Sequence, residues 1–195
     1  LLLAGFFFFG PSPQVNSESF VFDSFSYFDV ARGIAEFVDG RPYTVEALRT
    51  PGYPAIILAS SIVSHSDATH ISVLPSGNTD INEDTRKTSV AILWSQHLVA
   101  LIIPVVIFLL FRFISNSILV ALAAGVSFYC DLYTSSYQYS ISTEIVSVML
   151  FWCVIALLSA FVRWRSTIAL CVASIACSFA ITVRPQLSVL CVLIL

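Results

Sequence analysis

Residues Ser89–Phe111 read SVAILWSQHLVALIIPVVIFLLF, a run without Asp, Glu, Lys or Arg. About 20 predominantly apolar residues in a helix cross the hydrocarbon core of a bilayer, so this run predicts a transmembrane helix. The whole chain agrees, because 57% of its residues are hydrophobic and 11% are charged, whereas soluble domains carry roughly 25% charged residues. The predicted fold class is therefore all-α: a polytopic transmembrane helical bundle that forms a single domain over residues 1–195.

Further apolar runs lie on both sides of this segment. They predict the end of a first span at residues 1–9, spans at about 117–130, 142–162 and 167–183, and the start of a further segment at 186–195. The first and last of these runs lack the polar flanks of a complete membrane segment. We therefore expect the chain to be the N-terminal part of a larger protein.

The long connection over residues 10–88 is more polar and predicts a loop outside the membrane. Within it, apolar residues recur at i, i+3 and i+4 spacing over about 26–39, with charged residues on the opposite face, which indicates an amphipathic helix. Ser26 and Asp29 resemble a capping box at its start. A helix of this kind lies along a membrane surface, and we expect its apolar face to lie in lipid.

A second helix is predicted in the same loop. The apolar run from Ala55 to Val63 is nine residues long and predicts a helix over about 54–63. At 1.5 Å per residue such a run reaches roughly 14 Å, about half of a bilayer core. It should therefore lie beside the membrane or re-enter it, and it should not cross.

Basic residues set the expected orientation, since they favour the cytoplasmic side. Arg112 lies in one short connection, and Arg163 and Arg165 lie in another, two spans further on. Both connections are placed in the cytoplasm, which puts residues 10–88 and 131–141 on the extracytoplasmic side. The formal net charge of −3 gives no basic footprint for nucleic acid.

The external side then carries groups suited to a reaction of a lipid-anchored phosphate. Arginines such as Arg184 and Arg49 would hold the phosphate through charged hydrogen bonds. A carboxylate would take the proton of an attacking hydroxyl, and Asp23 is the best-placed candidate because it precedes the amphipathic helix. Glu144 is a second carboxylate on this side.

Several motifs resemble, in order, those of the GT-C glycosyltransferases, and more narrowly those of glycosyltransferase family 39, the protein O-mannosyltransferases and the aminoarabinose transferases of lipid A. The first external loop contains D-x-x-x-Y-x-x-x-A from Asp23, then G-R-P at residues 40–42 and R-x-P-G-Y-P at residues 49–54. YSISTEIVSVMLF at residues 139–151 and FAITVRPQ at residues 179–186 follow.

This resemblance implies a transferase that moves a sugar from a polyprenyl-phosphate carrier to an acceptor hydroxyl on the extracytoplasmic face of a bacterial cytoplasmic membrane. Asp23 would be catalytic, Arg184 and Arg49 would bind the donor phosphate, and Glu144 and Tyr27 would position the acceptor or substrate. The partners implied are the lipid-linked sugar, membrane lipid, and a glycan, lipid or protein acceptor. Ser24 stands where many relatives carry a second acidic residue, so no metal ligands are assigned and a divalent cation stays an open question.

Four of these five candidates could instead have a purely structural role. Asp23 could cap the helix that follows it, Glu144 could complement a helix dipole, and Arg184 could extend towards lipid headgroups. Arg49 could pair with Glu46. The alternative functions are a transporter or flippase, whose polar residues would lie inside the spans, and a non-catalytic membrane scaffold; convergence of the candidate residues at the outer surface would favour the transferase.

Overall fold

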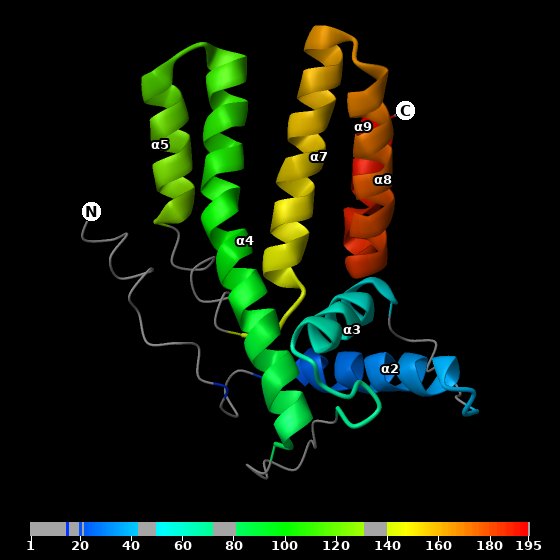
Figure 1. Ribbon diagram of the computed structural model, residues 1–195. Coiled ribbons are helices and arrows are strands. Elements are labelled where there is room, and N and C mark those ends of the chain that lie inside the picture. The colour runs from blue at the N-terminus through cyan, green and yellow to red at the C-terminus, as the bar shows by residue number, and fades with distance from the viewer. Residues whose placement is uncertain are drawn as a thin grey trace.

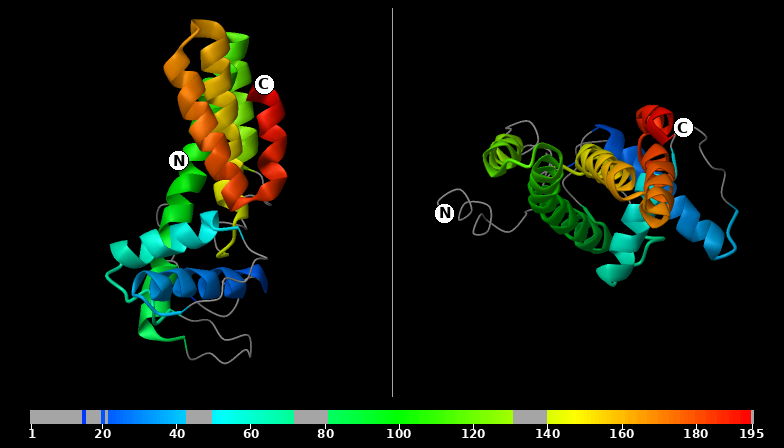
Figure 2. Two further views of the ribbon diagram at one scale, coloured as in Figure 1. Left: turned by 90° about the vertical axis from the view of Figure 1, so that its right-hand side faces the viewer. Right: turned by 90° about the horizontal axis from the view of Figure 1, so that it is seen from above.

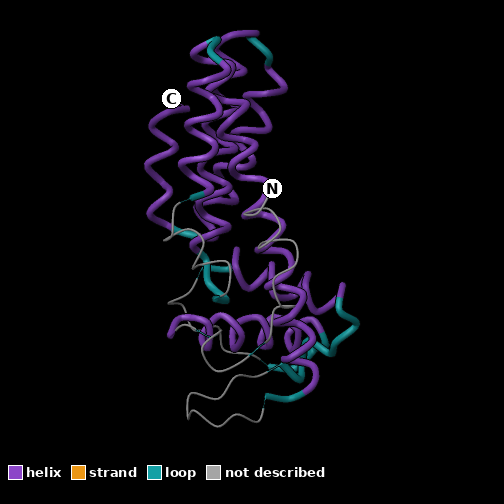
Figure 3. The backbone as a smooth tube through the Cα atoms, turned by 90° about the vertical axis from the view of Figure 1, so that its left-hand side faces the viewer, coloured by secondary structure: helices purple, strands orange, loops and turns teal. Residues whose placement is uncertain are grey.

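The computed structural model describes residues 15, 20, 22–42, 50–71, 81–130 and 140–194, without the side chains of 22, 23, 193 and 194. The regular elements of this part are helical (Figure 3). They are α2 (Phe22–Val38), α3 (Gly52–Val63), α4 (Glu83–Ser115), α5 (Ile118–Tyr129), α7 (Glu144–Trp164), α8 (Thr167–Val183), the 3₁₀ helix η2 (Pro185–Leu190) and α9 (Cys191–Ile194). The predicted all-helical class is confirmed for the described residues.

The helices form two groups with different directions (Figure 1). Helices α4, α5, α7 and α8 stand side by side, and α4 packs on α5 and α7 while α7 packs on α8. Helices α2 and α3 lie across one end of this bundle, packed on each other, and α4 extends past both of them (Figure 2). The molecule therefore has an upright bundle and a crosswise layer at one end.

Two helices of the bundle, α4 and α7, are long and apolar enough to cross a membrane. Helix α4 has 33 residues and measures roughly 50 Å at 1.5 Å per residue, which exceeds a bilayer core of about 30 Å. The additional length lies in the first turns of α4, and α4 contacts α3 of the crosswise layer. Helices α5 and α8 are shorter apolar helices, and the 12 residues of α5 reach only roughly 18 Å.

Tight turns connect the upright helices in two hairpins. Asn116 ends α4 and Arg165 ends α7 in the left-handed conformation, with φ of 55° and 53°. The next residue caps the following helix in each case: Ser117 accepts a hydrogen bond from the Val120 amide, and Ser166 accepts one from the Ala169 amide. Both hairpins turn at the end of the bundle remote from α2 and α3 (Figure 1).

The apolar face of α2 packs against protein. Tyr27, Phe28 and Ala31 are buried with Tyr53 and Ile57 of α3, and residues 92 and 93 of α4 complete the same core. The expectation that this face lies in lipid is wrong for Tyr27, Val30 and Ala31, which are buried within the protein, whereas Val38 at the end of the same face is 78% exposed. The charged face stays exposed, as the pattern predicts, with Arg32 3.2 Å from Asp29.

The start of α2 also differs from the expected capping box. The helix begins at Phe22, so Ser26 lies inside it and cannot be the N-cap.

Helix α3 begins at Gly52, directly after Pro51, and a proline in the first turn of a helix loses no backbone hydrogen bond. Pro54 therefore fits in this first turn.

Candidate functional site

An ion pair joins the start of α7 to the end of α8. Nη1 of Arg184 lies 3.3 Å from Oε1 of Glu144, and the two side chains are 38% and 28% exposed. Glu144 occupies the first turn of α7, where a carboxylate complements the positive end of the helix dipole. Arg184 follows α8 with extended backbone, as expected for the residue before a proline. Both predicted residues thus meet at one accessible point.

A buried hydrogen-bonded group lies next to this pair. Nε2 of Gln96, in α4, donates to the hydroxyl oxygen of Tyr53 at 3.0 Å and to the carbonyl oxygen of Ser142 at 2.9 Å. Tyr53 is fully buried and Gln96 is 1% exposed. One amide therefore links α3, α4 and the segment that leads into α7.

The electrostatics of Tyr53 connect this group to the ion pair. Burial raises the pKa of the Tyr53 phenol, and the negative charge of Glu144 raises it further. The phenol therefore stays neutral beside Glu144. It accepts the hydrogen bond from Gln96 and keeps its own O–H available as a donor.

Helix α3 also fixes the end of α8. A Cβ atom on Gly52 would lie 2.5 Å from the backbone carbonyl of Thr182, so the two backbones meet more closely than any other residue type permits. The Thr50 hydroxyl donates to the carbonyl oxygen of Val183 at 3.5 Å. The backbone that presents Arg184 is consequently held against the first turn of α3.

The first turn of α2 lies beside the segment that leads into α7. Ser24 donates a side-chain hydrogen bond to the Ile141 carbonyl, and Phe20 forms an isolated parallel bridge with Ile141. Ile141 precedes Glu144 by three residues. The backbone around Asp23 is therefore attached close to the start of α7.

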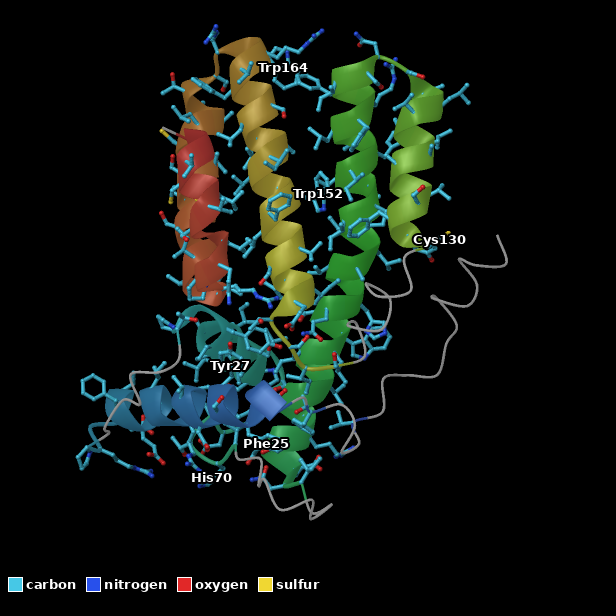
Figure 4. All side chains as sticks on the ribbon, turned by 180° about the vertical axis from the view of Figure 1, so that it is seen from behind. Phe25, Tyr27, His70, Cys130, Trp152 and Trp164 are labelled. Atoms are coloured by element: carbon cyan, nitrogen blue, oxygen red, sulfur yellow. The ribbon has the colours of Figure 1, made fainter. Side chains whose placement is uncertain are left out.

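Tyr27 belongs to the buried part of this region. Its ring packs edge-on against Tyr53, with ring centroids 5.2 Å apart, and Figure 4 shows it on the side of α2 that faces the bundle. Only 8% of the residue is exposed. Any effect of Tyr27 on a substrate would therefore act through Tyr53 or after a local opening.

The structure describes three of the five residues predicted from the sequence with their side chains. Glu144 and Arg184 are in contact, and the ring of Tyr27 packs against the ring of Tyr53. Asp23 lies in the first turn of α2, but its side chain falls outside the described residues, as does the whole of Arg49.

Sequence reasoning assigned no role to Tyr53 or Ser142. The available signal for Tyr53 was its place inside the P-G-Y-P motif. Gln96 is an amide within the apolar run Ser89–Phe111, and such amides commonly form hydrogen bonds between helices. The structure places all three within one network.

Some polar atoms of this network are buried without a hydrogen-bond partner among the described residues. They are Oε1 of Gln96 and Oγ of Ser142, and Oγ of Ser89, earlier in α4, is a further such atom outside the network. Buried polar atoms are rarely left unpaired in folded proteins, and Ser142 precedes Glu144 of the ion pair by two residues. The described residues contain no group of three or more His, Cys, Asp or Glu side chains that could hold a metal ion.

Comparison with known proteins gives no relative from which a function could be transferred. No protein-family description, no curated protein and no solved structure matches this chain.

Proposed function

We propose that the protein is a multi-pass glycosyltransferase of the GT-C type in a bacterial cytoplasmic membrane. It transfers a sugar from a polyprenyl-phosphate carrier to an acceptor hydroxyl on the extracytoplasmic face. The observation that carries the proposal is the contact between Arg184 and Glu144, 3.3 Å apart, at the end of an apolar bundle beside the first turn of α2.

The distribution of charge supports this placement. The described carboxylates lie in the crosswise layer or at the bundle end next to it: Asp29, Glu36, Asp39, Asp67, Glu83, Asp84 and Glu144. Arg112, Arg163 and Arg165 lie at the opposite end. The carboxylate-bearing end also has basic residues, namely Arg32, Arg41, Arg86, Lys87 and Arg184. The connections at the opposite end are short, however, and their charged residues are all basic. Because basic residues in short connections favour the cytoplasmic side, we assign the ion pair and α2 to the extracytoplasmic side.

The same distribution favours a transferase over a transporter. The charged residues of α4 and α7 lie in their first and last turns, and α8 contains none. A transport path through the bundle would call for ionisable groups within the spans. Here the charged residues lie at the two ends of these helices instead, and the ring of His97, which lies within α4, forms a hydrogen bond with the Leu93 carbonyl of its own helix.

The proposed reaction is a single displacement. The acceptor oxygen attacks the anomeric carbon, its proton passes to the Asp23 carboxylate, and the bond from the anomeric carbon to the phosphate oxygen breaks. The electron pair of that bond leaves with the polyprenyl phosphate. Arg184, together with Arg49, stabilises the charge that develops there, and Glu144 orients the acceptor, supported by the Tyr53 and Tyr27 rings beneath it.

The test is transfer of a radiolabelled sugar from a lipid-linked donor by the intact protein in proteoliposomes. Replacing a general base costs roughly 10²–10⁴-fold in rate, so Asp23→Asn should lose activity on that scale. Asp39→Asn, in the exposed turn directly after α2, is the control and should keep wild-type activity. Transfer at the wild-type rate by Asp23→Asn would disprove the assignment of this carboxylate.

A further inference from the structure

An apolar cleft lies between α4 and α7, in the half of the bundle remote from the crosswise layer. Its volume is about 380 Å³, within the range of roughly 300–1,000 Å³ that is common for ligand sites. The residues that bear on its shape are Leu110 and Phe113 of α4 and Cys153, Ala156, Ala160 and Trp164 of α7. The small side chains on α7 leave the space that forms the cleft.

The length of the cleft matches one leaflet of a bilayer. Its lining on α7 runs from Cys153 to Trp164, which corresponds to roughly 16 Å along a helix axis. Half of a bilayer core of about 30 Å is nearly the same length. Trp152 lies near the middle of the bundle and Trp164 at its remote end (Figure 4), so the cleft extends from the midplane to the remote surface.

The remote end is too narrow for a helix. The rings of Phe113 and Trp164 meet edge-on with centroids 5.0 Å apart and connect α4 to α7. A helix with side chains is about 10 Å wide, so its entry would require this ring contact to break. A single acyl chain is much thinner and can lie beside the rings.

Positive charge gathers at the same end. The guanidinium carbon of Arg163 lies 5.2 Å from the centre of the Phe113 ring, and Arg112 and Arg165 are exposed at the neighbouring helix ends. None of the three takes part in the ion pairs found within the described part of the chain. These cations are therefore available to a negatively charged headgroup.

We propose that this cleft binds an anionic glycerophospholipid, with one acyl chain between α4 and α7 and the phosphate at Arg112, Arg163 and Arg165. The proposal depends on the membrane location of the bundle and not on the sugar-transfer reaction. The site is separate from the Arg184–Glu144 pair, which lies at the other end of the same helices.

The test uses the intact protein in nanodiscs made from equal amounts of phosphatidylglycerol and phosphatidylcholine with identical acyl chains. Native mass spectrometry counts the lipids that stay bound after release. The wild type should retain phosphatidylglycerol about tenfold over phosphatidylcholine. Arg112→Gln/Arg163→Gln should lower this ratio to near one, whereas Arg86→Gln/Lys87→Gln, at the opposite end of α4, should leave it unchanged.

Two further variants test the cleft itself. Ala156→Phe and the milder Ala160→Leu should each reduce retention of both lipids at least fivefold, while circular dichroism shows unchanged helix content. Equal retention of both lipids by the wild type would overturn the proposal, as would undiminished retention in both cleft variants. A wild-type dimer that becomes monomeric in Ala156→Phe would also overturn it, because a second copy would then be the occupant.

Discussion

Arg184 and Glu144 lie 40 positions apart in sequence, and their side chains form an ion pair with 3.3 Å between nitrogen and oxygen. Both are partly exposed, and ion pairs in such positions contribute about 1 kcal/mol or less to stability. The pair can therefore open at little cost. An arginine that releases its carboxylate easily is well suited to accept a phosphate.

The first prediction concerns binding of polyprenyl phosphate. Replacing a charged hydrogen-bond donor costs about 1.5–3 kcal/mol, so Arg184→Gln should weaken binding by roughly 10–100-fold. Glu144→Gln removes the carboxylate that competes for Arg184, and it should strengthen binding by up to about fivefold. Fluorescence titration with a short-chain polyprenyl phosphate measures both changes.

The control for these variants is Arg32→Gln. Arg32 is paired with Asp29 at 3.2 Å on the exposed face of α2, so it offers a matched ion pair outside the proposed site. Its replacement should leave the dissociation constant unchanged. If Arg184→Gln binds polyprenyl phosphate as tightly as the wild type, Arg184 does not contact the donor phosphate.

A second prediction concerns the buried amide of Gln96. Gln96→Leu leaves the Ser142 carbonyl and the Tyr53 hydroxyl without their common donor, and an unpaired buried acceptor costs about 1–3 kcal/mol. The variant should therefore be destabilised by about that amount in thermal or denaturant unfolding. Ser95→Ala, at an exposed neighbouring position whose hydroxyl bonds only within α4, should change stability by about 0.5 kcal/mol at most.

Coupling between Gln96 and Tyr53 gives this prediction a second readout. Because both belong to one hydrogen-bonded group, the effects of Gln96→Leu and Tyr53→Phe should not add, and the double variant should be less destabilised than their sum. Strict additivity would show that the two side chains act independently.

A third prediction follows from the raised pKa of Tyr53. Burial and the Glu144 charge raise the pKa of this phenol in the folded state, while the unfolded chain titrates near 10. The unfolded state therefore loses this proton first, so the stabilising effect is complete below pH 10 and declines as pH rises. The slope due to Tyr53 should approach about 1.4 kcal/mol per pH unit above pH 10 and should average about half of that between pH 9 and 11.

Thermal unfolding between pH 9 and 11 tests this assignment. Tyr53→Phe removes the ionisable group and should flatten the decline by that amount relative to the wild type. A decline of equal steepness in both proteins would assign the pH dependence to another group.

A fourth prediction concerns the close contact of α3 with α8. Gly52→Ala would place its Cβ atom 2.5 Å from the Thr182 backbone, and overpacking of this kind costs about 1–3 kcal/mol. Because the same backbone presents Arg184, sugar transfer should fall along with stability.

Gly125→Ala in α5 is the graded control for this contact. Its nearest neighbours would be a backbone oxygen of Pro104 at 3.1 Å and Cβ of Phe108 at 3.3 Å, and alanine gains helix propensity of about 1 kcal/mol over glycine. Its effect on the free energy of unfolding should therefore be smaller than that of Gly52→Ala. Equal effects would contradict the special role of the contact between α3 and α8.

Periodicity and hydropathy predicted most of the helices, because these patterns are properties of neighbouring residues. The segment expected at 142–162 is helical over Glu144–Trp164, and the one expected at 167–183 is helical over those residues. Helix starts were less accurate: α2 begins four residues before the predicted start, since the core around Phe28 and Tyr53 stabilises an extra turn that no local cap signals.

The sequence by itself determined that the chain is helical, which runs are apolar enough for a membrane, and which charged residues deserved attention. Only the tertiary structure decided that the apolar face of α2 meets α3 and α4 rather than lipid, that Gln96 connects three segments, and that Glu144 touches Arg184. The physical reason is distance along the chain. Helix formation depends on residues a turn apart, whereas these contacts require segments tens of residues apart in the sequence to pack at one end of the bundle.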